Sequence, residues 1–267
     1  MTKRIITAVV GIPLLTFLLY KGDLYIFLGN LTITIIAILE YTFAMNKILK
    51  PKINVPLMVI LTILLVYTMG YNYTNSLPAL IIALVILFCY EVLNGKADVQ
   101  RGISSFFGLM YVPIMLSFML LFQYLPHGMV YLAMVFIVAF VTDTFALVIG
   151  LMFGKKTLAP KISPKKTIAG AIGGIIFAII SVIIYGLILK FYFKIDFPIW
   201  LCIVIGAVCS VAGQCGDLTA SLIKRYTGIK DFGKCLPGHG GILDRFDSII
   251  FILPVMYTFL IYTNNWI

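Results

Sequence analysis

The sequence predicts an all-α integral membrane protein, and both its composition and its long apolar runs indicate this class. Of the 267 residues, 62% are hydrophobic and only 11% are charged, and the mean hydropathy is +1.09. A soluble domain of this length cannot hide so many apolar side chains, because most residues on its surface must be polar. In lipid such runs form helices, since a helix satisfies its own backbone hydrogen bonds.

About nine transmembrane helices are predicted from the apolar runs. The first run follows Lys3 and Arg4, as in a signal peptide, but no small-x-small cleavage site comes after it, so we expect a retained helix. Several runs are short for a bilayer crossing, which takes about 20 residues. The predicted spans are residues 5–20, 24–45, 56–71, 78–93, 106–125, 129–153, 169–192, 198–223 and 248–262.

The distribution of Lys and Arg predicts the orientation of these helices. When the N-terminus and every second connection are assigned to one side, that side holds 17 of the 20 Lys and Arg residues. Basic residues are concentrated on the cytoplasmic side of membrane proteins. We therefore expect a cytoplasmic N-terminus and a C-terminus outside, with the net charge of +10 concentrated on one face. Such a face also attracts anionic lipid or nucleotide.

Acidic residues within predicted spans are candidate functional groups, because a charge in lipid is costly. Glu40 and Glu91 lie within two turns of predicted cytosolic helix ends, so each either snorkels to the interface or has a function. Asp143 lies deeper, about 15 Å from the end of its span at 1.5 Å per residue. A carboxylate at that depth needs a cation, a polar partner or water, so Asp143 is a functional candidate, with structural pairing as the alternative.

A fourth acidic residue, Asp217, opens the segment DLTASLIKR at the cytosolic end of the eighth span. Residues spaced i, i+4, i+7 and i+8 share one face of a helix. An interfacial stop-transfer cluster would explain the two cations on this face, but not the carboxylate and the hydroxyl beside them. The four residues are Asp217, Ser221, Lys224 and Arg225.

The next polar stretch joins GHGG to LDRFDS at the start of the last span. Gly240 and Gly241 permit close approach of backbone N–H groups to a phosphate, and His239 either contacts that phosphate or shapes the turn. Asp244 and Asp247 lie at a helix N-terminus, where a cap explains one of them. Two carboxylates at such a helix end would repel phosphate unless a divalent cation mediates. The stretch therefore indicates a site for a metal ion and a polyphosphate.

A third polar patch lies between the sixth and seventh spans and contains five lysines. Lys165 and Lys166 are candidate substrate ligands, and the alternative is that they only set the orientation of the chain. Thr167 is a predicted N-cap of the following helix. Gly170 and Gly174 form a GxxxG pair, which is typical of a close helix contact.

The segment from Ser221 to Ser248 resembles the signature of the phosphatidate cytidylyltransferases, also called CDP-diacylglycerol synthases. Upstream, DTFALVIG at Asp143 and ISPKKT at Ile162 are similar to two further segments of that family, although Leu147 and Ala169 replace its usual Tyr and Glu. Thirteen positions of the signature match with fixed gaps: Ser221, Lys224, Arg225, Lys230, Asp231, Pro237, Gly238, His239, Gly240, Gly241, Asp244, Arg245 and Asp247.

The resemblance implies the reaction of CTP with phosphatidic acid to give CDP-diacylglycerol and pyrophosphate, with Mg²⁺ as the cofactor. It implies three catalytic residues, Asp217, Asp244 and Lys224, and a metal site of Asp217 and Asp244 with Asp247 as a further ligand. If the glutamate replaced by Ala169 has a role, it passes to another carboxylate, Asp143 or Glu91. The implied substrate-binding residues are Ser221, Arg225, His239, Gly240, Gly241, Arg245, Lys165, Lys166 and Asp143.

We expect one polytopic membrane domain over residues 1–267, because no long polar segment or convincing repeat divides the chain. Residues 1–105 form N-terminal helices of uncertain role. Residues 129–267 form the catalytic helices, with cytosolic loops at 154–168 and 224–247. The five cysteines contain no CxxC pair, so structural zinc is not expected.

Two other functions are compatible with parts of this pattern. A CTP-dependent polyprenol kinase would transfer the γ-phosphate and release CDP. An ion-coupled transporter would use Asp143 and Asp217 as an ion site, but the polar groups are concentrated on one predicted face, whereas transport needs access from both. The expected partners are CTP, phosphatidic acid and membrane lipid, without nucleic acid, and a homodimer is left open. The expected location is the plasma (inner) membrane, with the active site facing the cytoplasm.

Overall fold

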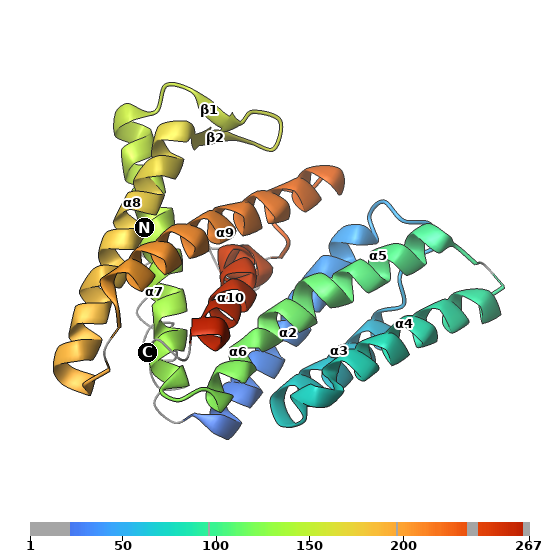
Figure 1. Cartoon of the computed structure of the whole chain (residues 1–267). Coiled ribbons are helices and arrows are strands. Elements are labelled where there is room, and N and C mark those ends of the chain that lie inside the picture. Colours follow the sequence, from blue (N-terminus) through green and yellow to red (C-terminus); the bar gives the residue numbers. More distant parts are fainter. Residues whose placement is uncertain (1–21, 96, 196, 234–239, 264–267) are drawn as a thin grey trace. The chain divides into compact units, whose positions relative to one another are not determined.

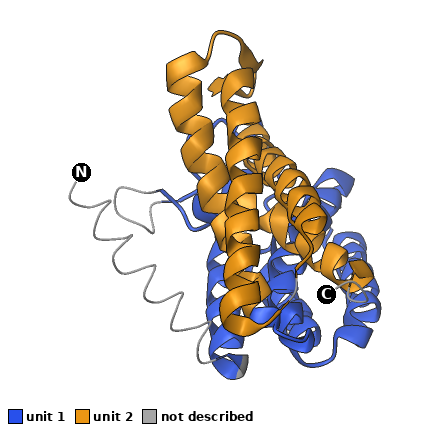
Figure 2. Cartoon of the chain, turned by 60° about the vertical axis from the view of Figure 1, so that its left-hand side comes forward, with its two compact units in different colours: residues 1–129, 224–246 blue, residues 130–223, 247–267 orange. Residues whose placement is uncertain are grey.

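The computed structural model describes residues 22–95, 97–195, 197–233 and 240–263, which are mainly helical (Figure 1). The chain forms two compact units (Figure 2): unit 1 comprises residues 1–129 and 224–246, and unit 2 comprises residues 130–223 and 247–267. Two helices belong to both units. Helix α9 (Ile199–Tyr226) runs from unit 2 into unit 1, and helix α10 (Leu243–Thr263) runs from unit 1 into unit 2.

Unit 1 is built mainly from helices of the N-terminal half of the chain. A π-helical turn that contains Pro113 joins α5 to α6, because proline has no N–H to continue the regular hydrogen bonding. The elements are α2 (Asp23–Met45), α3 (Val55–Tyr71), η1 (Tyr73–Asn75), α4 (Ser76–Leu93), α5 (Val99–Leu109), η2 (Met110–Ile114), α6 (Met115–Leu121) and η3 (Phe122–Tyr124).

Helix α2 packs against α3, α5 and α6 in unit 1. The buried Tyr41 hydroxyl donates to the Ser104 carbonyl at 2.9 Å, and a Cβ added at Gly108 would collide with the Tyr41 ring. The buried Asn30 side chain donates to the Leu116 carbonyl at 2.9 Å. Buried polar contacts therefore fix α2 within unit 1, in addition to its apolar packing.

Glu91 of α4 and Arg101 of α5 form a buried ion pair. Arg101 Nη2 lies 2.6 Å from Glu91 Oε2, and Arg101 Nε donates to Glu91 Oε1 at 2.7 Å. Glu91 also accepts the Asp98 N–H at 3.2 Å. The snorkelling alternative for Glu91 is thus wrong, because a guanidinium inside the unit pairs with both of its carboxylate oxygens.

Unit 2 contains most of α7 (Gly128–Phe153), followed by β1 (Thr157–Ala159), β2 (Ser163–Thr167), α8 (Ile168–Ile188), η4 (Leu189–Phe193) and the unit 2 parts of α9 and α10. Helices α7 and α8 approach closely at small residues: a Cβ at Gly170 would meet the Ala146 carbonyl oxygen, and one at Gly174 would lie 3.0 Å from the Thr142 carbonyl oxygen. Thr167 caps α8 by accepting the Gly170 N–H at 3.1 Å. The predicted glycine contact and N-cap are both confirmed.

Strands β1 and β2 form an antiparallel hairpin between α7 and α8 (Figure 1), with Thr157 opposite Thr167 and Ala159 opposite Ser163. The sequence predicts only a loop over residues 154–168. β-Branched threonines in the segment favour extended pairing, and Pro160 favours the turn between the strands. The hairpin matters for the site because β2 carries Lys165 and Lys166.

Seven helices in the described part of the chain are long and apolar enough to span a membrane, which confirms the class of all-α integral membrane protein. Helix α3 is apolar as well but has only 17 residues. The predicted first span, residues 5–20, lies outside the described residues, so the count of nine and the sides of the two termini stay predictions. The seven are Leu24–Met45, Tyr73–Leu93, Val99–Tyr124, Gly128–Phe153, Ile168–Phe193, Ile199–Tyr226 and Leu243–Thr263.

Candidate active site

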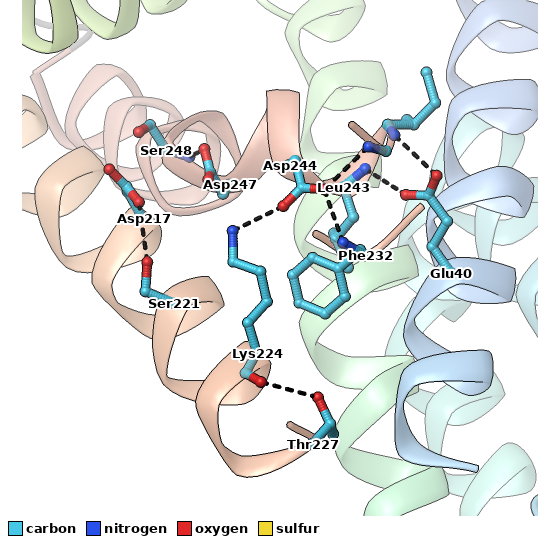
Figure 3. Close-up of polar contacts among 12 residues, drawn as sticks. Glu40, Asp217, Ser221, Lys224, Thr227, Phe232, Leu243, Asp244, Asp247 and Ser248 are labelled. Atoms are coloured by element: carbon cyan, nitrogen blue, oxygen red, sulfur yellow. Dashed lines mark hydrogen bonds and ion pairs between the residues drawn. The ribbon is translucent and has the colours of Figure 1, made fainter. Parts of the chain in front are cut away.

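The carboxylate of Asp244 is the centre of a polar cluster in unit 1 (Figure 3). Its Oδ1 lies 2.7 Å from Lys224 Nζ. Its Oδ2 accepts the N–H of Phe232 at 2.8 Å and that of Gly241 at 3.0 Å. One carboxylate thereby joins the end of α9, the loop that follows it and the start of α10. Two of the three predicted catalytic residues, Asp244 and Lys224, do lie together.

Lys224 is largely enclosed in this cluster. The exposed fraction of its side chain is 14%, and that of Asp244 is 6%. Lys224 Nζ also lies 5.5 Å from the centre of the Phe232 ring, which is a cation–π distance. Removal of one partner from a buried ion pair leaves an uncompensated charge, which typically costs about 3–5 kcal/mol. Neither partner can therefore be lost alone without destabilising the loop, and the pair places a cation at the site.

The turn before α10 depends on glycine. Gly240 has a φ of 84°, a left-handed conformation that glycine adopts without strain, and a Cβ there would lie 3.1 Å from Asp244 Oδ2. The Gly241 N–H, a predicted phosphate donor, donates to Asp244 instead. A phosphate at Gly241 would have to displace that carboxylate, so the role of this amide stays a prediction.

Glu40 of α2 holds the same turn, and the sequence does not identify this contact. Glu40 Oε1 accepts the Ile242 N–H at 3.0 Å, and Oε2 accepts the Leu243 N–H at 2.8 Å (Figure 3). These donors lie at the start of a helix, where free N–H groups and the helix dipole favour a carboxylate. Glu40 is only 7% exposed, so its snorkelling alternative is wrong. The partners are 202 and 203 residues apart in sequence, which no local pattern reveals.

A second polar cluster, in unit 2, surrounds Asp217 of α9. Lys166 of β2 forms an ion pair with Asp217 through Nζ and Oδ2. Ser221 Oγ, one turn further along α9, lies 3.5 Å from Asp217 Oδ1. The Lys166 side chain is 28% exposed, and the Asp217 side chain is 26% exposed. Three predicted site residues are thus brought together in a place that the protein only partly encloses.

Asp143 and Asp247 lie near Ser248 in the same unit. Ser248 Oγ lies 3.4 and 3.5 Å from the two carboxylate oxygens of Asp143, and the Ser248 N–H donates to Asp247 Oδ1 at 2.8 Å. A Cβ at Gly216 would meet the Asp247 carbonyl oxygen, so α9 and α10 touch next to Asp217. Helices α7, α9 and α10 therefore bring predicted site carboxylates to one region of unit 2.

The other predicted substrate ligands are mostly at the surface. Lys165, Arg225 and Arg245 are exposed. In unit 1 a shallow depression of about 360 Å³ is lined by Arg225, Gly228, Ile229 and Lys230. His239 lies outside the described residues, so its predicted role stays a prediction.

The donor set fits the magnesium ion that the sequence predicts. Within the described ranges, no three His, Cys, Asp or Glu side chains are close enough together to hold a metal ion without other ligands. Magnesium is commonly bound by one or two carboxylates together with substrate phosphates and water. Asp217 is partly exposed, and α10 touches α9 next to it at the Asp247 carbonyl, so the carboxylates of Asp217 and Asp247 would supply oxygen ligands of the kind that Mg²⁺ prefers.

Comparison with known proteins agrees with this architecture. Residues 2–263 match the family model described as the cytidylyltransferase family. A phosphatidate cytidylyltransferase of Staphylococcus saprophyticus is 35% identical over 265 residues, which cover 98% of this chain and 99% of that protein. A phosphatidate cytidylyltransferase of Staphylococcus epidermidis is 34% identical over 266 residues, which cover 98% of this chain and 100% of that protein. One of Staphylococcus aureus is 32% identical over 267 residues, which cover 98% of this chain and 99% of that protein.

The apolar helices and the family match together define a multi-pass membrane enzyme, in whose two clusters carboxylates are paired with lysines. The match covers nearly the whole length, including the N-terminal helices. The chain belongs to the cytidylyltransferase family.

Proposed function

We propose that this chain transfers the CMP moiety of CTP to phosphatidic acid, forming CDP-diacylglycerol and releasing pyrophosphate. The observation that carries the proposal is the similarity, over nearly the full length, to proteins named phosphatidate cytidylyltransferase. The polar clusters at the ends of apolar helices support it. A lipid substrate keeps its acyl chains in the bilayer while its head group meets a nucleotide from the aqueous phase.

In this reaction an oxygen of the lipid phosphate attacks the α-phosphorus of CTP, and the bond from that phosphorus to the bridging oxygen of the β-phosphate breaks. Phosphatidic acid is already an anion at neutral pH, so the attack needs no general base. Two polyanions must approach each other before any bond changes. Catalysis therefore depends mainly on positioning and on charge neutralisation.

The lysines and the arginines of the site supply that neutralisation. Lys166, which pairs with Asp217, and Lys165 on the same strand bind phosphate oxygens in unit 2. Lys224 and the exposed Arg225 and Arg245 supply further cations in unit 1. Ser221 and Asp143 orient the substrates through hydrogen bonds.

Mg²⁺ is the proposed cofactor, and Asp217 with Asp247 would hold it in unit 2. When bound, the ion would neutralise charge on the triphosphate. Asp244 is the remaining predicted ligand. Its two oxygens already accept two N–H groups and pair with Lys224, so a metal contact would have to replace one of these interactions.

We further propose that the enzyme acts in phospholipid biosynthesis at the cytoplasmic face of the plasma membrane. The bias of 17 of the 20 Lys and Arg residues to one predicted side supports this face, because basic residues are retained in the cytoplasm. The same cations attract anionic lipid and nucleotide.

The test is product analysis with the purified full chain in mixed micelles of detergent and phosphatidic acid, with Mg²⁺ and CTP labelled separately at the α- or the γ-phosphate. We expect the α-label in CDP-diacylglycerol and the γ-label in pyrophosphate, and loss of both products with EDTA or in Asp217→Asn. Label from the γ-phosphate in an added polyprenol would instead identify a CTP-dependent kinase. No transfer from either label, by folded protein, would refute the proposed reaction.

A further inference from the structure

The N-terminal helix α2 contributes a charged side chain to the turn that precedes α10. Glu40 accepts one N–H with each carboxylate oxygen, from Ile242 at 3.0 Å and from Leu243 at 2.8 Å. The side chain is buried, and α2 is fixed in unit 1 by its contacts with α3, α5 and α6. A carboxylate on a fixed helix thus holds the first donors of another helix.

The glycines around Glu40 show how closely the loop encloses it. A Cβ added at Gly233 would collide with Glu40 Oε1, and a Cβ added at Gly241 would collide with Glu40 Oε2. The segment before residue 234 and the segment after residue 239 therefore both contact this one carboxylate. No side chain larger than hydrogen fits at either position while Glu40 keeps its hydrogen bonds.

Glu40 and Asp244 divide the donors of the turn between them. Asp244 Oδ2 accepts the N–H groups of Phe232 and Gly241, and Glu40 accepts the next two along the chain. With Ile242 and Leu243 held, the first turn of α10 is fixed, and the Asp244 side chain is directed at Lys224. A shift of this turn would move Asp244 relative to Lys224.

We propose that Glu40 is a positioning residue, which fixes the first turn of α10 and thereby the place of Asp244 beside Lys224. Its effect on catalysis rests on the proposed function. The clamp, by which we mean the two hydrogen bonds from the Ile242 and Leu243 N–H groups to Glu40, is a property of the fold. The N-terminal helices thereby have a role in the site: α2 holds the turn before α10, and with it Asp244, in place. Glu40 need not touch either substrate.

Glu40→Gln tests the clamp with little change in volume. One acceptor oxygen becomes an NH₂ donor that faces a backbone N–H, so one of the two hydrogen bonds is replaced by a repulsive contact. We expect hydrogen–deuterium exchange at the Ile242 and Leu243 amides of the detergent-solubilised full chain to become about tenfold faster, since hydrogen bonds to charged groups are the stronger ones. We also expect kcat to fall about tenfold, with KM for CTP within about twofold.

Asn30→Ala is the matched control. Asn30 is a buried polar residue of the same helix, and it holds the Leu116 carbonyl rather than α10. Its loss lowers thermal stability, but α2 keeps its packing against α3 and α5, so kcat and the exchange at Ile242 and Leu243 stay unchanged. If Asn30→Ala lowers kcat as much as Glu40→Gln does, the effect of Glu40 is general destabilisation and the proposal is overturned.

Gly233→Ala provides a second variant that leaves Glu40 in place. The added methyl displaces the carboxylate, so kcat falls and exchange at residues 242–243 rises, as in Glu40→Gln. In a Glu40→Ala background the same substitution has little further effect, because nothing remains to displace. Equal effects of Gly233→Ala in both backgrounds would contradict the contact.

The outcomes separate the clamp from the proposed function. Unchanged exchange at residues 242–243 in Glu40→Gln overturns the clamp, whatever the activity. Faster exchange with wild-type kcat overturns the positioning role. A wild-type chain that makes no CDP-diacylglycerol refutes the proposed reaction and with it the catalytic role, while the exchange measurement still decides whether Glu40 holds α10.

Discussion

The two polar clusters contain the same kind of pair in different surroundings. In unit 1, Asp244 and Lys224 lie 2.7 Å apart with side chains 6% and 14% exposed, and the carboxylate accepts two backbone N–H groups as well. In unit 2, Asp217 and Lys166 are 26% and 28% exposed, and Ser221 lies at the longer distance of 3.5 Å. All four residues are predicted site residues, but only the first pair is hydrogen-bonded to the backbone of a loop.

We expect this difference to give the two pairs different roles: the unit 1 pair holds the site together, and the unit 2 pair takes part in the reaction. Exposed ion pairs contribute at most about 1 kcal/mol to stability. The partly exposed Lys166–Asp217 pair lies nearer to that limit than the buried pair does, so its partners can be exchanged for substrate or metal at lower cost. A buried pair cannot lose one partner without leaving a desolvated charge. We therefore expect substitutions in unit 1 to affect both stability and activity, and substitutions in unit 2 to affect activity alone.

Asp244→Asn is expected to have the largest effect. It leaves Lys224 enclosed without a counter-charge, so the free energy of unfolding falls by about 3 kcal/mol, and CDP-diacylglycerol formation falls at least about 100-fold. Thermal unfolding in detergent and product analysis measure the two losses. Adding Lys224→Met, which removes the unpaired charge, should recover stability but not activity. Loss of activity with unchanged stability would show that Asp244 does not hold the loop.

Asp217→Asn should produce a comparable loss of activity without the loss of stability. We expect product formation to fall about 100-fold, because a predicted metal ligand loses its charge, and the free energy of unfolding to change by about 0.5 kcal/mol or less. The same two measurements apply, together with the Mg²⁺ concentration needed for half-maximal rate, which should rise. Destabilisation as large as that in Asp244→Asn would remove the distinction between the clusters.

The sequence predicts which residues form these clusters better than it predicts how they are held. The signature identifies Ser221, Lys224 and Asp244, the shared helix face identifies Asp217, and the apolar runs predict the membrane class. Helix α10 begins at Leu243, as the acidic residues predicted at its N-terminus indicate, and thus ahead of the apolar span expected at 248–262. Hydropathy detects only the apolar part of a helix. The first turn of α10 is charged, so hydropathy misses it although its backbone is helical.

The contacts that the sequence does not predict are those between distant segments. Glu40 meets Ile242 and Leu243 only after folding. Lys166 reaches Asp217 from a strand in a segment that the sequence predicts to be a loop. The sequence does not predict the strands because, at three and five residues, they are too short for periodicity to detect. The signature indicates which residues react or bind, whereas the residues that hold or pair with them lie on α2 and on the β1–β2 hairpin.

Lys166→Gln sharpens the comparison by removing the cation of the unit 2 pair. We expect an effect of about tenfold on kcat/KM, mainly through a higher KM for CTP, because a phosphate ligand is lost while Asp217 remains. Lys161→Gln is the matched control, since Lys161 lies in the turn of the same hairpin, is exposed and is not a predicted substrate ligand. Its effect should stay within about threefold. Equal losses in both variants would mean that the hairpin attracts nucleotide only by its total charge.

Ser221→Ala should have the smallest effect of the series. The Ser221 hydroxyl lies 3.5 Å from Asp217 Oδ1, which is long for a hydrogen bond, so its removal should lower product formation by only about threefold. Thr219→Ala on the same helix is the control, because that hydroxyl donates to the Cys215 carbonyl at 2.8 Å, and no change is expected. A loss of about 100-fold in Ser221→Ala would instead place the hydroxyl on a substrate phosphate. The unit 2 cluster would then bind substrate through a neutral group as well as through its charges.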